Sequence, residues 1–202
     1  GGGSVLFHLL ETREFKQVIV SDANPELTLC YNMIKLDPKL VSECLQKICQ
    51  KYPEDKKGQA DIFFNIRDSW NQNVGTNLST VREKATRVAR TIFLNKTCFN
   101  GLFRVNSQGL FNVPPNYSKK PSFPSLDELK DVQRTLGDVE IKTCSYENSE
   151  DWINSLSFVY LDPPYRPLPE SSSFVAYTKS SFNDQNQIEL ASFCDRINSK
   201  GA

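Results

Sequence analysis

The stretch Ser157-Phe158-Val159-Tyr160-Leu161-Asp162-Pro163-Pro164-Tyr165 is an apolar run that ends in an acid and two prolines. Its aromatic and β-branched residues predict a buried strand, because such runs are typical of strands covered on both faces. Asp-Pro-Pro alone is also a good way to end a strand and turn. In an α/β protein, however, the carboxyl end of a strand is where the sheet places its functional site. We therefore interpret residues 162–165 as a candidate active-site motif.

The first residues of the chain supply the α/β pattern. Gly1, Gly2 and Gly3 lead into a helix-like apolar stretch at 5–10, and a short strand at 18–22 ends in Asp22. Glycines, helix, strand and acid follow in the order of half a dinucleotide-binding unit. The acid lies about 20 residues after the glycines, the spacing expected of a carboxylate that binds ribose hydroxyls. A leading Gly-Gly-Gly-Ser is also typical of an artificial linker, and this alternative stays open.

The middle and the end of the chain are expected to be mostly helical. Apolar periodicity and first-turn prolines predict helices at 25–34, 38–48, 62–70, 80–94 and 188–202, the last with Gly201 as its C-cap. The polar stretch at 51–60 is interpreted as a linker or as an excursion into a second subdomain. Strands are expected before Gly1 and after Ala202, and we therefore expect the chain to be part of a longer one.

Composition excludes several classes of protein. The chain has 202 residues, of which 39% are hydrophobic, enough for one or two domains. No run approaches the roughly 18 apolar residues of a membrane-spanning helix, so we expect no membrane partner. Six cysteines without a Cys-x-x-Cys pair and a single histidine, His8, offer little from which to build a metal site, and we expect no metal. Reduced thiols favour a cytoplasmic protein, expected to be a monomer or a weak dimer.

The basic residues are clustered, although 24 basic and 24 acidic residues balance over the chain. Between Arg82 and Lys120 there are eight basic residues and one acid. Such a segment is the electrostatic footprint expected where one face of a protein meets phosphates. A solvated helix face is the alternative interpretation.

Residues 98–114 lie inside this basic segment and predict a β-hairpin around a polar turn at 106–109. Arg104 and several asparagines can make the paired hydrogen bonds that read guanine and adenine edges. Exposed aromatic side chains can stack on bases or wedge between them. A purely structural hairpin has less reason to lie in the most basic part of the chain, so duplex DNA is the expected partner.

These motifs together resemble those of the Dam-type DNA adenine N6-methyltransferases of the alpha class, including the adenine methylases of GATC restriction systems. The resemblance covers nearly the whole chain and follows the family's order of motifs. It rests on the cofactor motif at 1–3, Asp-x-Asn at 22–24, the hairpin signatures at 100–104 and 111–114, Asp-Pro-Pro-Tyr at 162–165, and a later segment that begins at Ser173-Phe174 and ends at Tyr177-Thr178.

The resemblance implies a Rossmann-like S-adenosylmethionine-dependent α/β sheet with an inserted, mostly helical target-recognition domain that carries a β-hairpin. The catalytic domain would comprise residues 1–51 and 137–202, and the recognition domain residues 52–136. The implied enzyme is an adenine-specific DNA methyltransferase (EC 2.1.1.72) that transfers a methyl group to adenine N6 in duplex DNA after base flipping. The implied target is GATC, in restriction-modification or in housekeeping methylation.

The same resemblance implies roles for single residues. Asp162 and Pro163 accept hydrogen bonds from the target amino group, Pro164 stiffens the motif, and Tyr165 stacks on the flipped base. Phe99 resembles the aromatic that intercalates beside that base, and Arg104 is the strongest candidate for reading guanine. The expected cofactor-binding residues are Gly1, Gly2, Gly3, Asp22, Asn24, Ser145 and Asp162. The expected DNA-binding residues are Phe99, Asn100, Leu102, Arg104, Asn112, Pro114, Lys119 and Lys120.

Two departures from the family pattern keep alternatives open. Ser145 stands where the family often has an aspartate that contacts the cofactor adenine, and the family's Lys-Trp-x-Gly-Gly-Lys segment is not found in the sequence. One alternative is a catalytically impaired, sequence-specific DNA-binding protein of the same fold. Another is an amino-methyltransferase that acts on RNA or on cytosine N4, against which stand Asp162 before Pro-Pro-Tyr and the hairpin signature.

Overall fold

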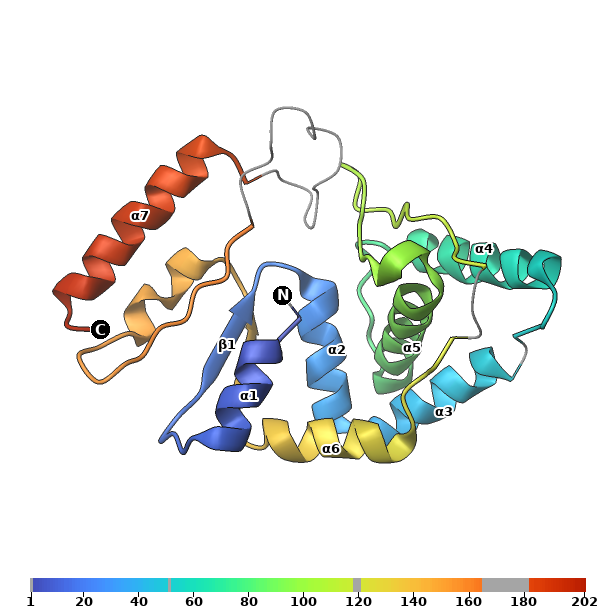
Figure 1. The fold of residues 1–202 in the computed structure, drawn as a ribbon, viewed down its shortest axis with the longest axis horizontal. Helices are drawn as coiled ribbons and strands as arrows, with labels where there is room; N and C mark the ends of the chain where they lie inside the picture. The colour runs from blue at the N-terminus through green and yellow to red at the C-terminus, as the bar shows by residue number, and fades with distance from the viewer. Residues whose placement is uncertain (1, 51, 118–120, 165–181) are drawn as a thin grey trace.

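The computed structural model describes residues 2–50, 52–117, 121–164 and 182–202, and Figure 1 shows their arrangement. Two short strands pair in parallel, and helices make up most of the rest, so the described chain is a mixed α/β structure. The elements in chain order are α1 (Ser4–Thr12), β1 (Ile19–Asp22), α2 (Pro25–Leu36), α3 (Pro38–Cys49), α4 (Lys56–Gln72), α5 (Val81–Thr97), the 3-10 helix η1 (Phe99–Gly101), α6 (Leu126–Leu136), β2 (Glu140–Thr143), the 3-10 helix η2 (Tyr146–Trp152) and α7 (Asp184–Ser199).

Local capping explains where several helices begin. The side chain of Asn24 accepts a hydrogen bond from the backbone of Glu26, so α2 begins at Pro25 as the sequence predicts. Helix α4 begins at Lys56 rather than near residue 62, because Asp55 caps it by accepting from the backbone of Gly58. Residues 51–60, interpreted from the sequence as a linker or as an excursion into a second subdomain, are thus a connection only in their first half, and the second half belongs to α4.

The helical core lies mainly between α3 and α5, and its side chains come from the apolar faces that the sequence predicts. Val41 of α3 and Val88 and Phe93 of α5 are completely buried. The aromatic rings of Phe63 and Trp70 on α4 close the core on the side of residues 103–111. Burial of these side chains is the main source of stability for this part of the fold.

The sheet brings together two segments that are far apart in the sequence. Ile19 of β1 lies opposite Glu140 of β2, and Asp22 lies opposite Thr143. Because the strands are parallel, their carboxyl ends meet at one edge. Helix α2 packs on this pair: the hydroxyls of Thr28 and Thr143 are 2.6 Å apart and share a hydrogen bond.

The strand predicted at 157–161 is not formed. This segment is unpaired in the structure, with Phe158 73% exposed and Tyr160 54% exposed. Val159 and Leu161 face the other way and pack against a second, smaller apolar cluster around Phe193 of α7. A strand needs a neighbour to bond its backbone groups. Within the described residues β1 and β2 pair only with each other, so the expected alternation of sides is present without the pairing.

The predicted hairpin at 98–114 is reduced to two isolated antiparallel bridges, Cys98 with Pro115 and Val105 with Phe111. The polar turn is confirmed, since the amide of Gly109 donates to the carbonyl of Asn106 over 2.8 Å. Continuous strands do not form in this segment, because the two prolines at 114 and 115 lack an N–H group and η1 interrupts the first arm.

Candidate functional site

The carboxyl edge of the sheet brings the predicted acid and the predicted Ser145 to adjacent strands. Asp22 ends β1, Ser145 follows β2, and the amide of Cys144 donates to the carbonyl of Asp22 over 3.2 Å. The hydroxyl of Ser145 donates to the carboxylate of Glu147 over 2.7 Å. This edge therefore offers two carboxylates and a hydroxyl within a few residues of the strand ends, the position at which open α/β sheets bind ligands.

The glycines before α1 adopt the left-handed conformation that favours glycine, with φ of 65° at Gly2 and 88° at Gly3. A Cβ on Gly3 would lie 2.9 Å from the hydroxyl oxygen of Tyr31, whereas a Cβ on Gly2 would meet nothing within 4 Å. The hydroxyl of Tyr31 donates to the carbonyl of Gly2 and holds this turn against α2. The backbone at Gly2 is thus fixed on one side and open on the other; Gly1 lies outside the described residues.

The electrostatics link this turn to the sheet edge. Burial raises the pKa of Asp22 above its usual range, although a hydrogen bond from the backbone of Asn24 lowers it in part. Burial also raises the pKa of Tyr31, and the nearby acidic groups of Cys30 and Asp22 add to the effect. Hydrogen bonds from hydroxyl groups stabilise a partly desolvated carboxylate, because they replace the hydrogen bonds to water that burial has removed.

The side chain of Asn24 has a structural role as the N-cap of α2. Asn24 is buried, and its oxygen caps α2 by accepting from the backbone amide of Glu26 over 3.0 Å. Its own backbone amide donates to Asp22 over 2.7 Å. In this structure Asn24 therefore shapes the loop that holds Asp22.

The described part of the Asp-Pro-Pro motif runs beside the same region of the fold. Val159 and Leu161, which precede it, belong to the apolar cluster that includes Tyr146, the residue after Ser145. Asp162 is exposed, and the carbonyl of Pro164 accepts a hydrogen bond of 3.3 Å from the side chain of Gln187 on α7. In Figure 1 this orange segment and β1 run towards the same side of the molecule. Tyr165 and residues 173–178 lie outside the described residues.

The residues predicted to contact DNA lie mostly on the outside of the segment 98–115. Phe99 is 55% exposed, and Leu102 beside it is also exposed. Asn100, between them, has a φ of 55° and turns the chain sharply at η1. The side chains from 111 to 114 alternate, with Phe111 and Val113 buried and the other two exposed. The segment thus exposes apolar side chains at Phe99 and Leu102 next to the buried Phe111 and Val113.

Arg104 and Asn112 face each other across this segment. The Nε atom of Arg104 donates to the side-chain oxygen of Asn112 over 2.9 Å, and a guanidinium N–H donates to the carbonyl of Asn112 over 3.5 Å. A guanidinium held in this way is oriented before any partner arrives, which reduces the ordering cost of binding.

One expectation about the basic segment is wrong. Arg87, counted among its charges, is 3% exposed and forms an ion pair with Glu26 of α2, so it lies inside the protein rather than on a face that meets phosphates. Arg87 is flanked in the sequence by the apolar residues Ala85, Val88 and Ala89, which are buried on the same helix. These flanking residues are the sequence signal for an interior arginine. Lys119 and Lys120 lie outside the described residues.

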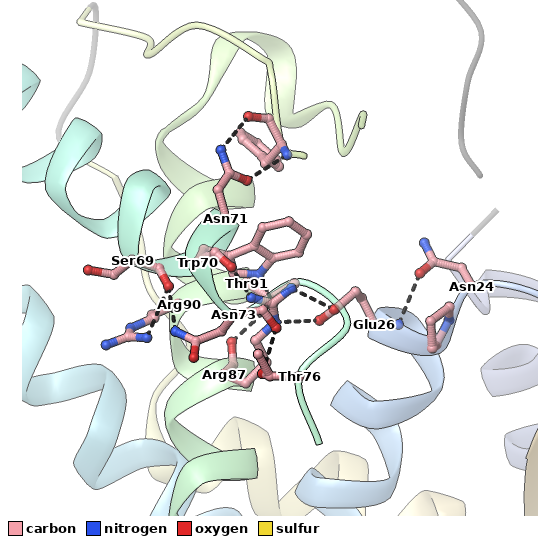
Figure 2. Close-up of polar contacts among 12 residues, drawn as sticks. Asn24, Glu26, Ser69, Trp70, Asn71, Asn73, Thr76, Arg87, Arg90 and Thr91 are labelled. Carbon is pink, nitrogen blue, oxygen red and sulfur yellow. Dashed lines mark hydrogen bonds and ion pairs between the residues drawn. The ribbon is translucent and has the colours of Figure 1, made fainter. Parts of the chain in front are cut away.

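Sequence reasoning also missed the side chains that join the helices to this segment, which Figure 2 shows. Asn71 of α4 donates to the carbonyl of Phe111 over 3.2 Å and accepts from its amide over 2.8 Å. Arg87 donates to the carbonyl of Trp70 and stacks on its ring, with 3.6 Å from Cζ to the ring centroid. A local sequence pattern cannot predict such contacts, because the two residues in each of them are 17 to 61 positions apart in the sequence.

Two kinds of feature are absent from the described residues. Among these residues, no group of three or more His, Cys, Asp or Glu side chains could hold a metal ion. No helix in the described parts of the chain has the length and apolar character to cross a membrane.

Comparison with known proteins places the chain among enzymes of one kind. A family model described as D12 class N6 adenine-specific DNA methyltransferase matches residues 1–202. The chain is 42% identical to the type II methyltransferase M.MjaIII of Methanocaldococcus jannaschii, over all of this chain and 68% of that protein. It is 30% identical to the type II methyltransferase M1.LlaDCHI of Lactococcus lactis, with 66% of that protein covered, and 29% identical to the DNA adenine methylase of Escherichia coli K12, with 65% covered. The chain thus spans about two thirds of the length of these relatives.

Proposed function

We propose that this chain, which belongs to the D12 class N6 adenine-specific DNA methyltransferase family, transfers a methyl group from S-adenosylmethionine to adenine N6 in duplex DNA. The observation that carries the proposal is the common edge of β1 and β2, where Asp22 and Ser145 lie at adjacent strand ends, together with the Gly2-Gly3 turn that Tyr31 of α2 holds. The resemblance of each motif to its family counterpart then gives the chemistry. The type II and Dam names of the relatives support roles in restriction-modification or in housekeeping methylation.

The domain organisation that we propose follows the same resemblance. Residues 1–51 and 137–202 belong to a Rossmann-like catalytic domain, and residues 52–136 form an inserted recognition domain. The parallel pairing of β1 with β2 supports the first part, since it joins segments on the two sides of the insertion. The helices α4 and α5 and the bridged segment 98–115 support the second part.

The residues at the sheet edge fit S-adenosylmethionine. The carboxylate of Asp22 is an acceptor for two ribose hydroxyls, and the open backbone at Gly2 allows close approach of the amino acid part. Asn24 holds the Asp22 loop in shape. Ser145 lacks the charge of the aspartate common in the family, but its hydrogen bond to Glu147 keeps a carboxylate at this position. When bound, S-adenosylmethionine supplies an electrophilic methyl group on a sulfonium sulfur.

The Asp-Pro-Pro-Tyr motif acts on the target amine. The Asp162 carboxylate and the Pro163 carbonyl accept hydrogen bonds from the two N6 hydrogens, which holds the nitrogen close to tetrahedral geometry and directs its lone pair at the methyl carbon. Transfer would replace the C–S bond of the donor by a C–N bond, and the carboxylate of Asp162 would accept the proton that N6 loses and pass it to solvent. Pro164 restricts the backbone, and Tyr165 stacks on the adenine after it leaves the helix.

Recognition is assigned to the exposed side of residues 98–115, together with the lysines at 119 and 120. Phe99 fills the space beside the flipped base, and Arg104, already oriented by Asn112, pairs with the O6 and N7 atoms of guanine. The remaining contacts come from Asn100, Leu102 and Pro114. GATC is the proposed site, because the hairpin signature resembles that of family members that read GATC.

The proposal is tested by transfer of labelled methyl from S-adenosylmethionine to a duplex with one GATC, measured with the complete protein chain. Matched duplexes replace the target adenine or the guanine, and Asp162→Asn keeps the shape of the side chain without its charge. Transfer that requires the adenine, the guanine and Asp162 supports the reaction, the target and the site. Equal transfer to all duplexes rejects GATC. Tight, salt-sensitive DNA binding without transfer rejects the enzyme in favour of a DNA-binding protein.

A further inference from the structure

Arg87 is a buried charge that the proposed chemistry does not use. It lies in the middle of α5, is 3% exposed, and is surrounded by the helical core. Burying a guanidinium is costly unless its donors find partners. The partners that it finds lie on two different elements, α2 and α4, and Figure 2 shows them around the guanidinium group.

On one side Arg87 binds α2, the helix that follows the loop of Asp22 and Asn24. Its Nε and Nη2 atoms donate to the two carboxylate oxygens of Glu26 over 2.9 and 2.7 Å, a bidentate pair. Glu26 is in the first turn of α2, and its backbone amide is the donor that Asn24 caps. Asn24 in turn donates its amide to Asp22. Three hydrogen-bonded links, through Glu26 and Asn24, therefore connect the guanidinium to the carboxylate assigned to the ribose.

On the other side Arg87 holds the base of the segment assigned to DNA. It donates to the carbonyl of Trp70 and stacks on the indole ring. That ring contacts Phe103 and Phe111 edge-on, at 6.0 and 6.1 Å between centroids. The next residue, Asn71, bonds both backbone groups of Phe111. Through the ring of Trp70, the same guanidinium thus supports Phe103 and Phe111, which lie on the two sides of the turn at 106–109.

We propose that Arg87 is a positioning residue that couples binding of the methyl donor at the Asp22 loop to binding of DNA at residues 98–115. The proposal rests on the function proposed above, since it takes both sites from it. A bidentate, stacked arginine fixes both the distance and the orientation between Glu26 and Trp70. A shift of α2 on cofactor binding therefore changes the position of Trp70, on which residues 98–115 pack. Coupling of this kind is reciprocal: each ligand must tighten the other by the same factor.

The experiment measures the affinity for a duplex with one GATC, with and without saturating S-adenosylhomocysteine, in the complete protein chain. In the parent protein we expect S-adenosylhomocysteine to tighten duplex binding by about fivefold or more, the lower end of typical coupling between sites. In Arg87→Met, which keeps the stem on Trp70, we expect the factor to fall below about twofold, with each ligand alone bound almost as in the parent. Glu26→Gln should act in the same direction.

Two kinds of control separate coupling from general loosening. Arg134→Met breaks an exposed arginine–carboxylate pair on α6 and should keep the parent's factor. Val41→Ala lowers the melting temperature through a core residue outside these contacts, and should also keep it. The double variant Arg87→Met/Glu26→Gln removes the unpaired carboxylate, protects the fold, and should lose no more coupling than Arg87→Met does.

The outcomes are distinct. Loss of the factor in both Arg87 variants, with the parent's factor in both controls, supports the proposal. Methyl transfer by the parent together with undiminished coupling in Arg87→Met overturns the role of Arg87 and leaves the proposed function intact. Equal loss in Val41→Ala overturns it as well. A parent that neither transfers methyl nor binds S-adenosylhomocysteine refutes the proposed function, and the coupling with it.

Discussion

Replacing Phe93 by leucine removes a completely buried ring that two other rings contact. Phe93 of α5 stacks on Phe123, before α6, with 5.7 Å between centroids and 8° between planes. It also meets Tyr52, before α4, edge-on at 5.8 Å. The ring therefore fastens two connecting segments to the helical core, and its loss is expected to loosen both.

The expected cost follows from these contacts. Each aromatic pair contributes about 0.5–1.5 kcal/mol beyond area burial, and the smaller side chain gives up about 1 kcal/mol of apolar burial. Phe93→Leu should therefore lower the free energy of unfolding by about 2–4 kcal/mol. For a chain of this size that corresponds to a fall in melting temperature of roughly 5–15 °C.

The assay is urea unfolding followed by tryptophan fluorescence, with thermal melts alongside. Phe15→Leu is the matched control, because that ring is 43% exposed, and it should change stability by less than about 0.5 kcal/mol. A double-mutant cycle of Phe93→Leu with Phe123→Leu should give a coupling of about 0.5–1.5 kcal/mol. Equal stability of Phe93→Leu and Phe15→Leu, or no coupling between Phe93→Leu and Phe123→Leu in the cycle, would refute the packing argument.

Three further predictions concern recognition, a helix end and a thiol. Arg104→Lys replaces a bidentate donor by a point charge and should reduce discrimination for guanine by about 1–3 kcal/mol, measured as the ratio of kcat/KM for duplexes with and without it; an unchanged ratio would exclude Arg104 as the reader. Glu128 caps α6 with Ser125, and backbone and side-chain hydrogen bonds from Ser125 lower its pKa. Its folded pKa is thus below its unfolded one, so Glu128→Gln should be less stable than the parent near neutral pH, and the difference should vanish as the pH falls through the lowered pKa; a constant difference would contradict this sign. Burial raises the pKa of Cys30 to about 12, so iodoacetamide at pH 8 should label it far more slowly in the folded than in the unfolded protein, and equal rates would show that the thiol is not protected.

Local signals made several elements predictable from the sequence. Pro25 and Pro38 begin helices as expected, because a proline in the first turn combines with a polar cap just before it. The turn at 106–109 is likewise set by residues that lie beside one another. For the same reason the Gly2-Gly3 turn and the end of β1 at Asp22 agree with the expected order of a ligand-binding unit.

Interactions between distant segments were not predictable in the same way. The run 157–161 has the composition of a strand, but pairing depends on a neighbour that composition does not name. Arg87 looked like one more surface charge, because its partner Glu26 is 61 residues away. The roles proposed for Asp162 and Arg104 rest on the resemblance of their motifs, and the structure adds the hydrogen bond that orients Arg104 on Asn112.

The parallel pairing of β1 with β2 also bears on the order in which the chain folds. Helices α2 to α5 contact one another within a single stretch of the chain, whereas Asp22 meets Thr143 only after that whole stretch has been synthesised. The entropy of closing such a loop rises only with the logarithm of its length, so a large helical block between the strands is tolerated, but contacts between such distant segments form slowly. We therefore expect helices α2 to α5 to assemble first on the ribosome, and the edge of the sheet to form only later, when β2 emerges.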